Sequence, residues 1–382
     1  MDDSNHTKFN SCNQTLLTPN EVLRYSRHFS LIGVDGQESL KQAKVLCVGA
    51  GGLGCSVLQY LVAVGVGTLG VIDHDHVSIS NLTRQILFTE DDIGKLKVSV
   101  AKERLTALNS SVCLNVYPKR LEKNTTELIT QYDIIIDASD NYKTRYLIND
   151  ACFLLKKPLV SASIFQFQGQ ISIFNYQDGP CYRCLYPEPP HPELAFNCDT
   201  NGVIGVLPGL IGTIQATEVI KIILNKGKLL SKRLLQVDAL LMQIKELVIQ
   251  KNPYCRLCHH GELSDHLFER EAVQNHSFSE IEPQQLAAWI NDPNLTIDLI
   301  DVREDFERKI CHIGGKHIPS KQFKISEITS DKKKTVVVYC KKGSRSLKIV
   351  KRLREEGFLE IYSLKRGLIG WIEEIDPNLL RY

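Results

Sequence analysis

A glycine-rich stretch, G-A-G-G-L-G at residues 49–54, most constrains what this chain can fold into. A short apolar run at 44–49 leads into it, an apolar helical pattern follows at 56–67, and a second apolar run at 68–73 completes a β-α-β unit. Glycines between a strand and a helix allow backbone amides to approach a phosphate at the positive end of the helix. The stretch therefore predicts a nucleotide-binding α/β domain.

The alternation of strands and helices continues beyond this unit. Strand patterns occur at 112–117, 133–139, 158–163 and 233–249, and helical patterns at 95–108, 142–156 and 209–224. Such alternation is typical of a doubly wound, mostly parallel, Rossmann-like sheet. The chain also predicts more than one domain, because 382 residues exceed what one ordinary core holds.

A second, smaller α/β pattern follows a polar stretch. We expect the first domain to span residues 1–260, a histidine-dotted linker to occupy 261–276, and the second domain to span 277–382. The second domain has helical patterns at 279–290 and 344–356 and strand patterns at 295–302, 335–340 and 361–364. The chain is thus predicted to join two α/β domains of unequal size.

Charge and hydropathy disfavour several classes of protein. The chain has 46 Lys and Arg against 44 Asp and Glu, a formal net charge of +2, so nothing global indicates a nucleic-acid or membrane-surface partner. We find no apolar run of the length of about 18 residues that spans a bilayer, and the polar N-terminus lacks the order of a signal peptide. We therefore expect a soluble, cytoplasmic protein.

Polar residues near the ends of successive predicted strands favour adenylation over dinucleotide binding. Asp73 ends the second strand, where a carboxylate can bond a ribose hydroxyl. Asn81, Arg84 and Lys97 follow it, and Asp140, at the end of a later strand, is our magnesium candidate. Attack of a carboxylate on the α-phosphate of ATP needs cations around the phosphates and a carboxylate that holds magnesium. An NAD-dependent oxidoreductase and a structural glycine turn remain alternatives.

Two C-x-x-C pairs, Cys181/Cys184 and Cys255/Cys258, supply four thiolates, the number that a closed tetrahedral zinc site requires. Disulfides are disfavoured in a cytosolic chain, and a redox pair would need only one C-x-x-C at the start of a helix. We therefore predict a structural zinc site with no open position for catalysis.

The second domain carries a cysteine loop, C-K-K-G-S-R-S at 340–346. The loop amides, Arg345, the serine hydroxyls and the positive end of the following helix would all stabilise a thiolate or persulfide anion on Cys340. Phosphatase loops place the arginine one position further from the cysteine, so the smaller ring here suits a sulfane sulfur. A buried cysteine at the end of a strand is the alternative.

The order of motifs in the first domain closely resembles the MoeB/ThiF group of ubiquitin-activating-like adenylyltransferases over about residues 21–260. The motifs are R-Y-S-R-H, D-G-Q-E-S-L, G-A-G-G-L-G, S-N-L-T-R-Q, D-A-S-D-N, P-C-Y-R-C and N-P-Y-C-R-L-C. The resemblance implies that ATP activates the C-terminal Gly-Gly carboxylate of a small ubiquitin-like sulfur carrier of the MoaD or ThiS type. The residues that it assigns to magnesium-ATP and its loop are Gly49, Gly51, Gly52, Gly54, Asp73, Ser80, Asn81, Leu82, Thr83, Arg84, Lys97, Asp140 and Asn141.

The same resemblance has three further implications. Arg27 matches an arginine that reaches the nucleotide of the other subunit, which implies a homodimer with two shared sites. The four C-x-x-C cysteines match a zinc tetrad. Cys198 matches a cysteine that in some relatives takes part in covalent chemistry with the carrier, and a bystander role is equally open.

The second domain resembles a rhodanese over about residues 277–382. The shared motifs are L-I-D-V-R-E-D-F-E, H-I-G-G-K-H-I-P and the loop that begins at Cys340, and the lysine-rich stretch 320–334 departs from the pattern. The whole chain is similar to fused adenylyltransferase/sulfurtransferases of the MoeZ type, which serve molybdopterin, thiamine or tRNA thiolation. The resemblance implies that a Cys340 persulfide, loaded by a cysteine desulfurase or thiosulfate, converts the adenylated carrier into a thiocarboxylate. A non-catalytic rhodanese that only docks a partner is the alternative.

Overall fold

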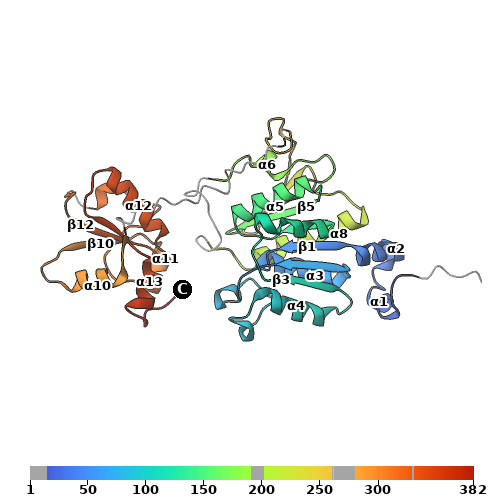
Figure 1. Ribbon diagram of the computed structural model, residues 1–382, viewed down its shortest axis with the longest axis horizontal. Coiled ribbons are helices and arrows are strands. Elements are labelled where there is room, and N and C mark those ends of the chain that lie inside the picture. Colours follow the sequence, from blue (N-terminus) through green and yellow to red (C-terminus); the bar gives the residue numbers. More distant parts are fainter. Residues whose placement is uncertain (1–14, 191–201, 260, 262–279, 329–330) are drawn as a thin grey trace, which may run out of the picture. The chain divides into compact units, whose positions relative to one another are not determined.

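The computed structural model describes residues 15–190, 202–259, 261, 280–328 and 331–382, which form two compact units, Met1–Arg270 and Glu271–Tyr382 (Figure 1). Cys198 and nearly all of the predicted linker lie outside the described residues. The exact domain boundaries therefore stay predictions.

The first unit is built on one eight-stranded sheet with the order β3-β2-β1-β4-β5-β6-β7-β8. Its strands are β1 (Lys44–Val48), β2 (Thr68–Ile72), β3 (Cys113–Tyr117), β4 (Ile134–Asp137), β5 (Leu159–Phe165), β6 (Gln168–Phe174), β7 (Arg233–Asp238) and β8 (Gln243–Val248). The pairs among β3, β2, β1, β4 and β5 are parallel, and the pairs from β5 to β8 are antiparallel. The parallel part has the doubly wound order that the strand and helix alternation predicts.

Helices cover both faces of this sheet, with α5 (Tyr142–Leu154) on one side and α3 (Gly52–Val64) and α4 (Lys97–Leu108) on the other (Figure 1). Successive residues of β1 alternate between the two cores, because side chains of a strand point to opposite faces. Val45 and Cys47 pack in the core that includes α3, whereas Leu46 and Val48 pack in the core that includes α5. Both faces of the strand are thereby buried, which explains its continuous apolar sequence.

Helix α8 (Val206–Leu224) is, within the described residues, the one helix long and apolar enough to cross a membrane by length and composition. Its sequence is not an uninterrupted apolar run, because it includes Gln215, Glu218 and Lys221. Leu207, Ile211 and Val219 are nevertheless buried in the same core as α3. Packing on the sheet accounts for the apolar character of this helix.

The second unit is a five-stranded parallel sheet with the order β11-β10-β12-β13-β9. Its strands are β9 (Glu280–Ile281), β10 (Ile297–Asp301), β11 (Lys316–His317), β12 (Thr335–Tyr339) and β13 (Ile361–Leu364), and its helices are α10 (Pro283–Asn291), α11 (Asp305–Ile310), α12 (Ser344–Glu355) and α13 (Gly367–Glu374). Val338 and Val350 share one core, and Val337 and Leu368 share the core on the other face. The unit is an α/β domain, as predicted for a rhodanese.

Two predicted helices begin four residues away from their predicted start. Helix α3 begins at Gly52 rather than at residue 56, because the last glycines of the loop form its first turn. Helix α10 begins at Pro283 rather than at residue 279, since proline favours the first helical position and the residues before it pair as β9. The glycine loop is therefore partly helical.

Candidate functional site

The glycine loop is packed tightly against its surroundings except at Gly51. A Cβ atom on Gly54 would lie 2.1 Å from the Gly49 carbonyl oxygen, and one on Gly49 would lie 2.6 Å from the Ala138 carbonyl oxygen. A Cβ atom on Gly52 would lie 2.9 Å from Pro208, whereas on Gly51 the nearest atom would be 3.8 Å away. The loop is thus forced close to β4, and Gly51 has the most open side.

Asp73 connects the glycine loop to the segment that follows β2. One carboxylate oxygen of Asp73 accepts a hydrogen bond from the Ala50 amide at 2.7 Å, and the other accepts one from the Asp75 amide at 2.8 Å. The ammonium of Lys97, 5% exposed at the start of α4, donates to Asp75 at 3.1 Å. Asp75 was not among the predicted site residues, although it stands two positions after Asp73.

The predicted S-N-L-T-R segment folds as a turn around the 3₁₀ helix η1 (Ile79–Asn81). Asn81 accepts a hydrogen bond from the Ser78 amide at 3.3 Å, and Arg84 donates to the Ser80 carbonyl at 3.0 Å. These bonds hold Ser80 to Arg84 together in one turn, with Leu82 and Thr83 between them.

A buried orphan group near this turn fits a nucleotide ligand. Gln85 is 3% exposed, and its Oε1 has no hydrogen-bond partner among the residues that the structure describes. Its Nε2 atom is the nearest neighbour of the open side of Gly51. Because an unpaired buried polar group costs free energy, Gln85 is suited to bind a polar group that lies on the loop.

Asp140 and Asn141 lie at the end of β4, beside the glycine loop that follows β1, its parallel neighbour. Asn141 caps α5 by accepting a hydrogen bond from the Thr144 amide at 2.9 Å, and its side-chain nitrogen donates to Asp140 at 3.3 Å. Both side chains are exposed. This cap places the predicted magnesium ligand at the carboxyl edge of the sheet.

A buried ion pair, absent from the sequence predictions, supports this loop. Asp137 is fully buried and accepts hydrogen bonds from Arg145 at 3.1 Å, Ser139 at 2.5 Å and Ser161 at 2.8 Å. Arg145 also donates to the Ser139 carbonyl at 3.1 Å. Burial alone would lower the pKa of Arg145, but the Asp137 carboxylate raises it, so the guanidinium stays charged.

Arg27 lies in the turn between α1 (Pro19–Arg24) and α2 (Phe29–Gln42) and is exposed. The role predicted for Arg27 is a contact with the nucleotide of another subunit. This role stays a prediction, as does the role of Cys198.

The four predicted zinc ligands come together in the first unit. The sulfur atoms of Cys181, Cys184, Cys255 and Cys258 all lie within 4.8 Å of one another. The separations are 3.7 Å for Cys181–Cys184, 3.6 Å for Cys181–Cys255 and 3.2 Å for Cys184–Cys258. Four thiolates at the usual zinc–sulfur distance of a tetrahedral site lie about 3.8 Å apart, so the residues fit the ion. The hydrogen bond between Cys181 and Cys184 lowers the pKa of the Cys184 thiol and raises the pKa of the Cys181 thiol.

Cys340 lies directly after β12, fully buried, with its sulfur enclosed by the loop. The Gly343 amide donates to the sulfur at 3.2 Å, and Ser346 donates from its amide at 3.5 Å and from its hydroxyl at 3.4 Å. Gly343 adopts a left-handed conformation, φ 93°, which glycine tolerates best, and this turns the chain into α12. Three donors therefore converge on the sulfur at the positive end of a helix.

Arg345 makes a contact that the sequence did not predict. Its two terminal nitrogens donate to the carboxylate of Glu307 at 2.6 and 2.7 Å. Glu307 is buried and also accepts a hydrogen bond from the Glu304 amide at 2.9 Å. Burial alone would raise the pKa of Glu307, but hydrogen bonds from Arg345 and the Glu304 amide lower it. Glu307 closes the quoted D-V-R-E-D-F-E motif, yet nothing in the sequence marks it as the partner of Arg345.

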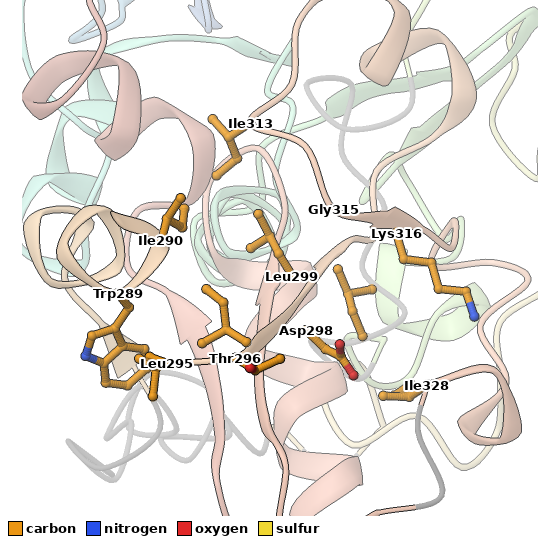
Figure 2. A pocket seen from close by; sticks show the side chains of 12 residues that line it. Trp289, Ile290, Leu295, Thr296, Asp298, Leu299, Ile313, Gly315, Lys316 and Ile328 are labelled. Carbon is orange, nitrogen blue, oxygen red and sulfur yellow. The ribbon is translucent and has the colours of Figure 1, made fainter. Parts of the chain in front are cut away.

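A separate cavity of about 620 Å³ lies along β10 in the second unit (Figure 2). Figure 2 shows that apolar side chains of Trp289, Leu295, Leu299 and Ile313 line it, with Asp298 and Lys316 among its polar residues. Neither Cys340 nor any other predicted site residue contributes to its lining.

Matches to known families agree with this geometry. Residues 25–257 match the ThiF family, and residues 282–374 match the rhodanese-like domain. The chain belongs to the ThiF family. Its two predicted resemblances are thereby confirmed, and this ThiF-family chain carries a rhodanese-like domain after its adenylation fold.

Curated relatives match the ThiF-family chain over two thirds or more of its length. A Mycobacterium tuberculosis protein, "Probable adenylyltransferase/sulfurtransferase MoeZ", is 38% identical over 389 residues, with 96% of each chain covered. A Thermus thermophilus protein, "Sulfur carrier protein adenylyltransferase", is 47% identical over 269 residues, covering 68% of this chain and 97% of its own. The crystal structure of E. coli MccB with MccA-N7isoASN has a TM-score of 0.57 at 23% identity, covers 65% of this chain and 76% of that chain, and supports the fold alone.

These matches identify the ThiF-family chain as an adenylyltransferase and sulfurtransferase. They give no support to the alternative of an NAD-dependent oxidoreductase.

Proposed function

We propose that the chain adenylates the C-terminal glycine carboxylate of a small ubiquitin-like sulfur carrier protein and then converts it into a thiocarboxylate with sulfur from Cys340. The observation that carries the proposal is the Cys340 sulfur, held by three donors in a loop, on a chain whose other unit has the ThiF adenylation fold. A chain with both units can activate a carboxylate and supply the sulfur that replaces its oxygen.

In the first step, a carboxylate oxygen of the carrier attacks the α-phosphorus of ATP, and pyrophosphate leaves. The open side of Gly51 and the buried Gln85 would bind the nucleotide, with Asp73 near its ribose. Arg84 and Lys97 supply positive charge for the pentavalent phosphorus, whose developing charge cations stabilise. Asp140, exposed at the sheet edge, would hold magnesium, which when bound neutralises phosphate charge.

In the second step, the outer sulfur of a Cys340 persulfide attacks the carbonyl carbon of the acyl-adenylate, and AMP leaves. The product is an acyl disulfide between Cys340 and the carrier. Two electrons from a thiol reductant then cleave the sulfur–sulfur bond, which leaves the carrier thiocarboxylate and the Cys340 thiolate. The Gly343 amide and the two Ser346 donors stabilise sulfur anions at the start and the end of this relay.

The four-cysteine cluster has a structural role in this proposal. Cys181, Cys184, Cys255 and Cys258 would fill all four positions of a zinc ion, so no position remains for a water or a substrate. Zinc would fasten the segment after β6 to the segment after β8.

Several finer roles belong to the same proposal. We assign Arg27 to the nucleotide site of a second subunit in a homodimer, and Cys198 either to carrier chemistry or to none. The sulfur donor is thiosulfate or a cysteine desulfurase, and the compartment is the cytoplasm. Molybdopterin synthesis, thiamine synthesis and tRNA thiolation are the pathways that use such carriers.

Intact mass of the carrier tests the function. The full-length chain is incubated with a candidate carrier, ATP, a thiol reductant and thiosulfate, and we expect a gain of about 16 Da, because sulfur replaces oxygen. ATP–pyrophosphate exchange should require the carrier. The Cys340→Ala variant should keep this exchange and lose the mass gain, whereas Cys113→Ala, which removes an exposed cysteine of the first unit, should keep both. Unchanged thiocarboxylate formation by Cys340→Ala would favour a non-catalytic rhodanese.

A further inference from the structure

The side chain of Tyr382 contacts Lys341, at the start of the Cys340 loop, and Glu307, which binds Arg345 near the end of the loop. Its hydroxyl lies 3.1 Å from Glu307 Oε1, and its ring lies under the ammonium of Lys341 at 4.3 Å from the centroid. Lys341 directly follows Cys340, and Glu307 binds Arg345 at the far end of the loop. One tyrosine therefore touches one cation of the loop and the carboxylate partner of the other.

The hydroxyl of Tyr382 has a fixed orientation because both of its hydrogen-bonding functions are used. It accepts a hydrogen bond from Arg303 at 2.8 Å and donates one to Glu307. Arg303 is fully buried and is itself held by Asp301 at 2.7 and 2.9 Å. The buried pair thus anchors the hydroxyl, and the hydroxyl steadies the carboxylate that binds Arg345.

The ring of Tyr382 packs against the ammonium of Lys341. A lysine ammonium over an aromatic face is attracted by the electron-rich ring, and the contact at Lys341 is shorter than the 5.9 Å contact of Arg303 with the same ring. A cation that is already in place costs no reorganisation when an anion arrives. The ring therefore holds the ammonium of the residue that directly follows Cys340 in the chain.

We propose that Tyr382 is a positioning residue for the sulfur-transfer step: its ring fixes Lys341, and its hydroxyl, bonded to Arg303 and Glu307, fixes the ring. The ammonium of Lys341 then presents a preset positive charge to an anionic sulfur compound that approaches the loop, while Arg345 stays paired with Glu307. The inference rests on the proposed role of Cys340 as the sulfur-accepting thiol.

Alkylation of Cys340 by two reagents of different charge tests the role of the ring. Iodoacetate is anionic and iodoacetamide is neutral. The rate of alkylation of Cys340 by each reagent is followed by the mass of the peptide that contains Cys340. The ratio of the two rates reports the positive charge near Cys340, because a looser structure would speed both reactions alike. We expect Tyr382→Leu and Lys341→Met each to lower this ratio about three- to fivefold, the loss of one cation–aromatic contact. Tyr382→Phe, which retains the ring, should stay within about twofold of the wild type.

Two comparisons separate positioning from packing. The double variant Tyr382→Leu/Lys341→Met should have the same ratio as Lys341→Met, because the ring acts through the lysine. Tyr362→Leu removes another tyrosine of this unit, one that packs on Trp289, and should leave the ratio unchanged. Additive effects in the double variant, an unchanged ratio in Tyr382→Leu, or an equal fall in Tyr362→Leu would overturn the proposal.

Thiosulfate:cyanide turnover by the full-length chain gives a second readout. Thiosulfate donates its outer sulfur to the Cys340 thiolate and leaves as sulfite, and cyanide removes that sulfur as thiocyanate. Tyr382→Leu should raise the KM for thiosulfate about three- to fivefold and change kcat less than about twofold. If Trp fluorescence shows that this variant is unfolded, Tyr382→Met, whose longer and more flexible side chain fills irregular gaps, replaces it in both assays.

Different results would contradict the proposed role of Cys340 and the proposed role of Tyr382. A wild-type chain that makes no thiocyanate overturns the role of Cys340, whereas an active wild type with an unaltered Tyr382→Leu variant overturns the role of Tyr382.

Discussion

Replacement of Glu307 by glutamine should destabilise the second unit without affecting the first. The carboxylate accepts hydrogen bonds from both terminal nitrogens of Arg345, from the Glu304 amide and from the Tyr382 hydroxyl. Glutamine has nearly the same shape but one acceptor oxygen and no charge. Its amide nitrogen would therefore face a donor, and Arg345 would lose its counter-charge.

The magnitude follows from burial and from the solvent access of the arginine. Breaking a buried ion pair by removal of one partner costs about 3–5 kcal/mol. The side chain of Arg345 is 24% exposed, so water can recover part of its solvation, and we expect a loss of about 2–3 kcal/mol. For a unit of this size, that loss corresponds to a fall in the midpoint of thermal unfolding of about 10–20 °C.

The loss should also depend on pH. Hydrogen bonds from Arg345 and the Glu304 amide outweigh burial and lower the pKa of Glu307 below its ordinary value of 4.5. A carboxyl whose pKa is lower in the folded state stabilises the fold above its ordinary pKa, and this stabilisation is lost as the pH falls through the lowered value. Glutamine does not titrate. The difference in unfolding free energy between the wild type and Glu307→Gln should therefore be at its largest at pH 7 and should become smaller below pH 4.5.

Tryptophan fluorescence provides the assay. Both tryptophans of the chain, Trp289 and Trp371, lie in the second unit, so their signal during urea unfolding of the full-length protein reports that unit. Glu360→Gln is the matched control, because this exposed glutamate also accepts a tyrosine hydrogen bond, and it should change stability by less than about 0.5 kcal/mol. Equal midpoints for Glu307→Gln and Glu360→Gln at pH 7, or a gap that widens in acid, would refute the reasoning.

Three further predictions concern the first unit. Gly54→Ala should impair folding and ATP–pyrophosphate exchange, because its Cβ atom would meet backbone at 2.1 Å, whereas Gly51→Ala, with 3.8 Å of space, should fold normally as judged by thermal melting. Arg145→Leu should lower the free energy of opening, measured by hydrogen exchange of the β4 amides, by about 3–5 kcal/mol. In an Asp137→Asn background the same substitution should lower it much less. Equal losses in the two backgrounds would show that the two side chains are not coupled. Cys255→Ser should abolish the binding of one zinc ion per chain, measured by elemental mass spectrometry, and should lower the unfolding free energy by more than about 3 kcal/mol; retention of zinc would exclude this cluster as the site.

The main elements of the fold could be predicted because buried parallel strands are apolar throughout. The run at β1 is apolar on both faces since helices cover both, and glycines at the end of such a run leave few alternatives to a β-α-β unit. The element ends were less certain, since whether Gly52 belongs to the loop or to the helix depends on close packing against Pro208.

The partners of charged residues could not be predicted, because they depend on contacts between distant parts of the chain. The loop at Cys340 has a sulfur and an arginine close in sequence, which indicated that Arg345 faces the sulfur. In the folded unit Glu307, 38 positions earlier in the chain, binds the guanidinium through both of its terminal nitrogens. The hydroxyl of Tyr382 donates to the carboxylate of Glu307 as well. No local sequence pattern marks a tyrosine as a hydrogen-bond donor to a distant carboxylate.

The order of the four clustered cysteines along the chain has a consequence for biosynthesis. The last of them, Cys258, follows β8, so it leaves the ribosome after all eight strands of the first sheet. All of the strands and helices that build the parallel core around β1 and β4 are therefore synthesised before the cluster is complete. A metal ion would then bind all four cysteines only late in synthesis. A nascent chain that stalls before Cys258 could not hold the metal ion in a closed four-cysteine site.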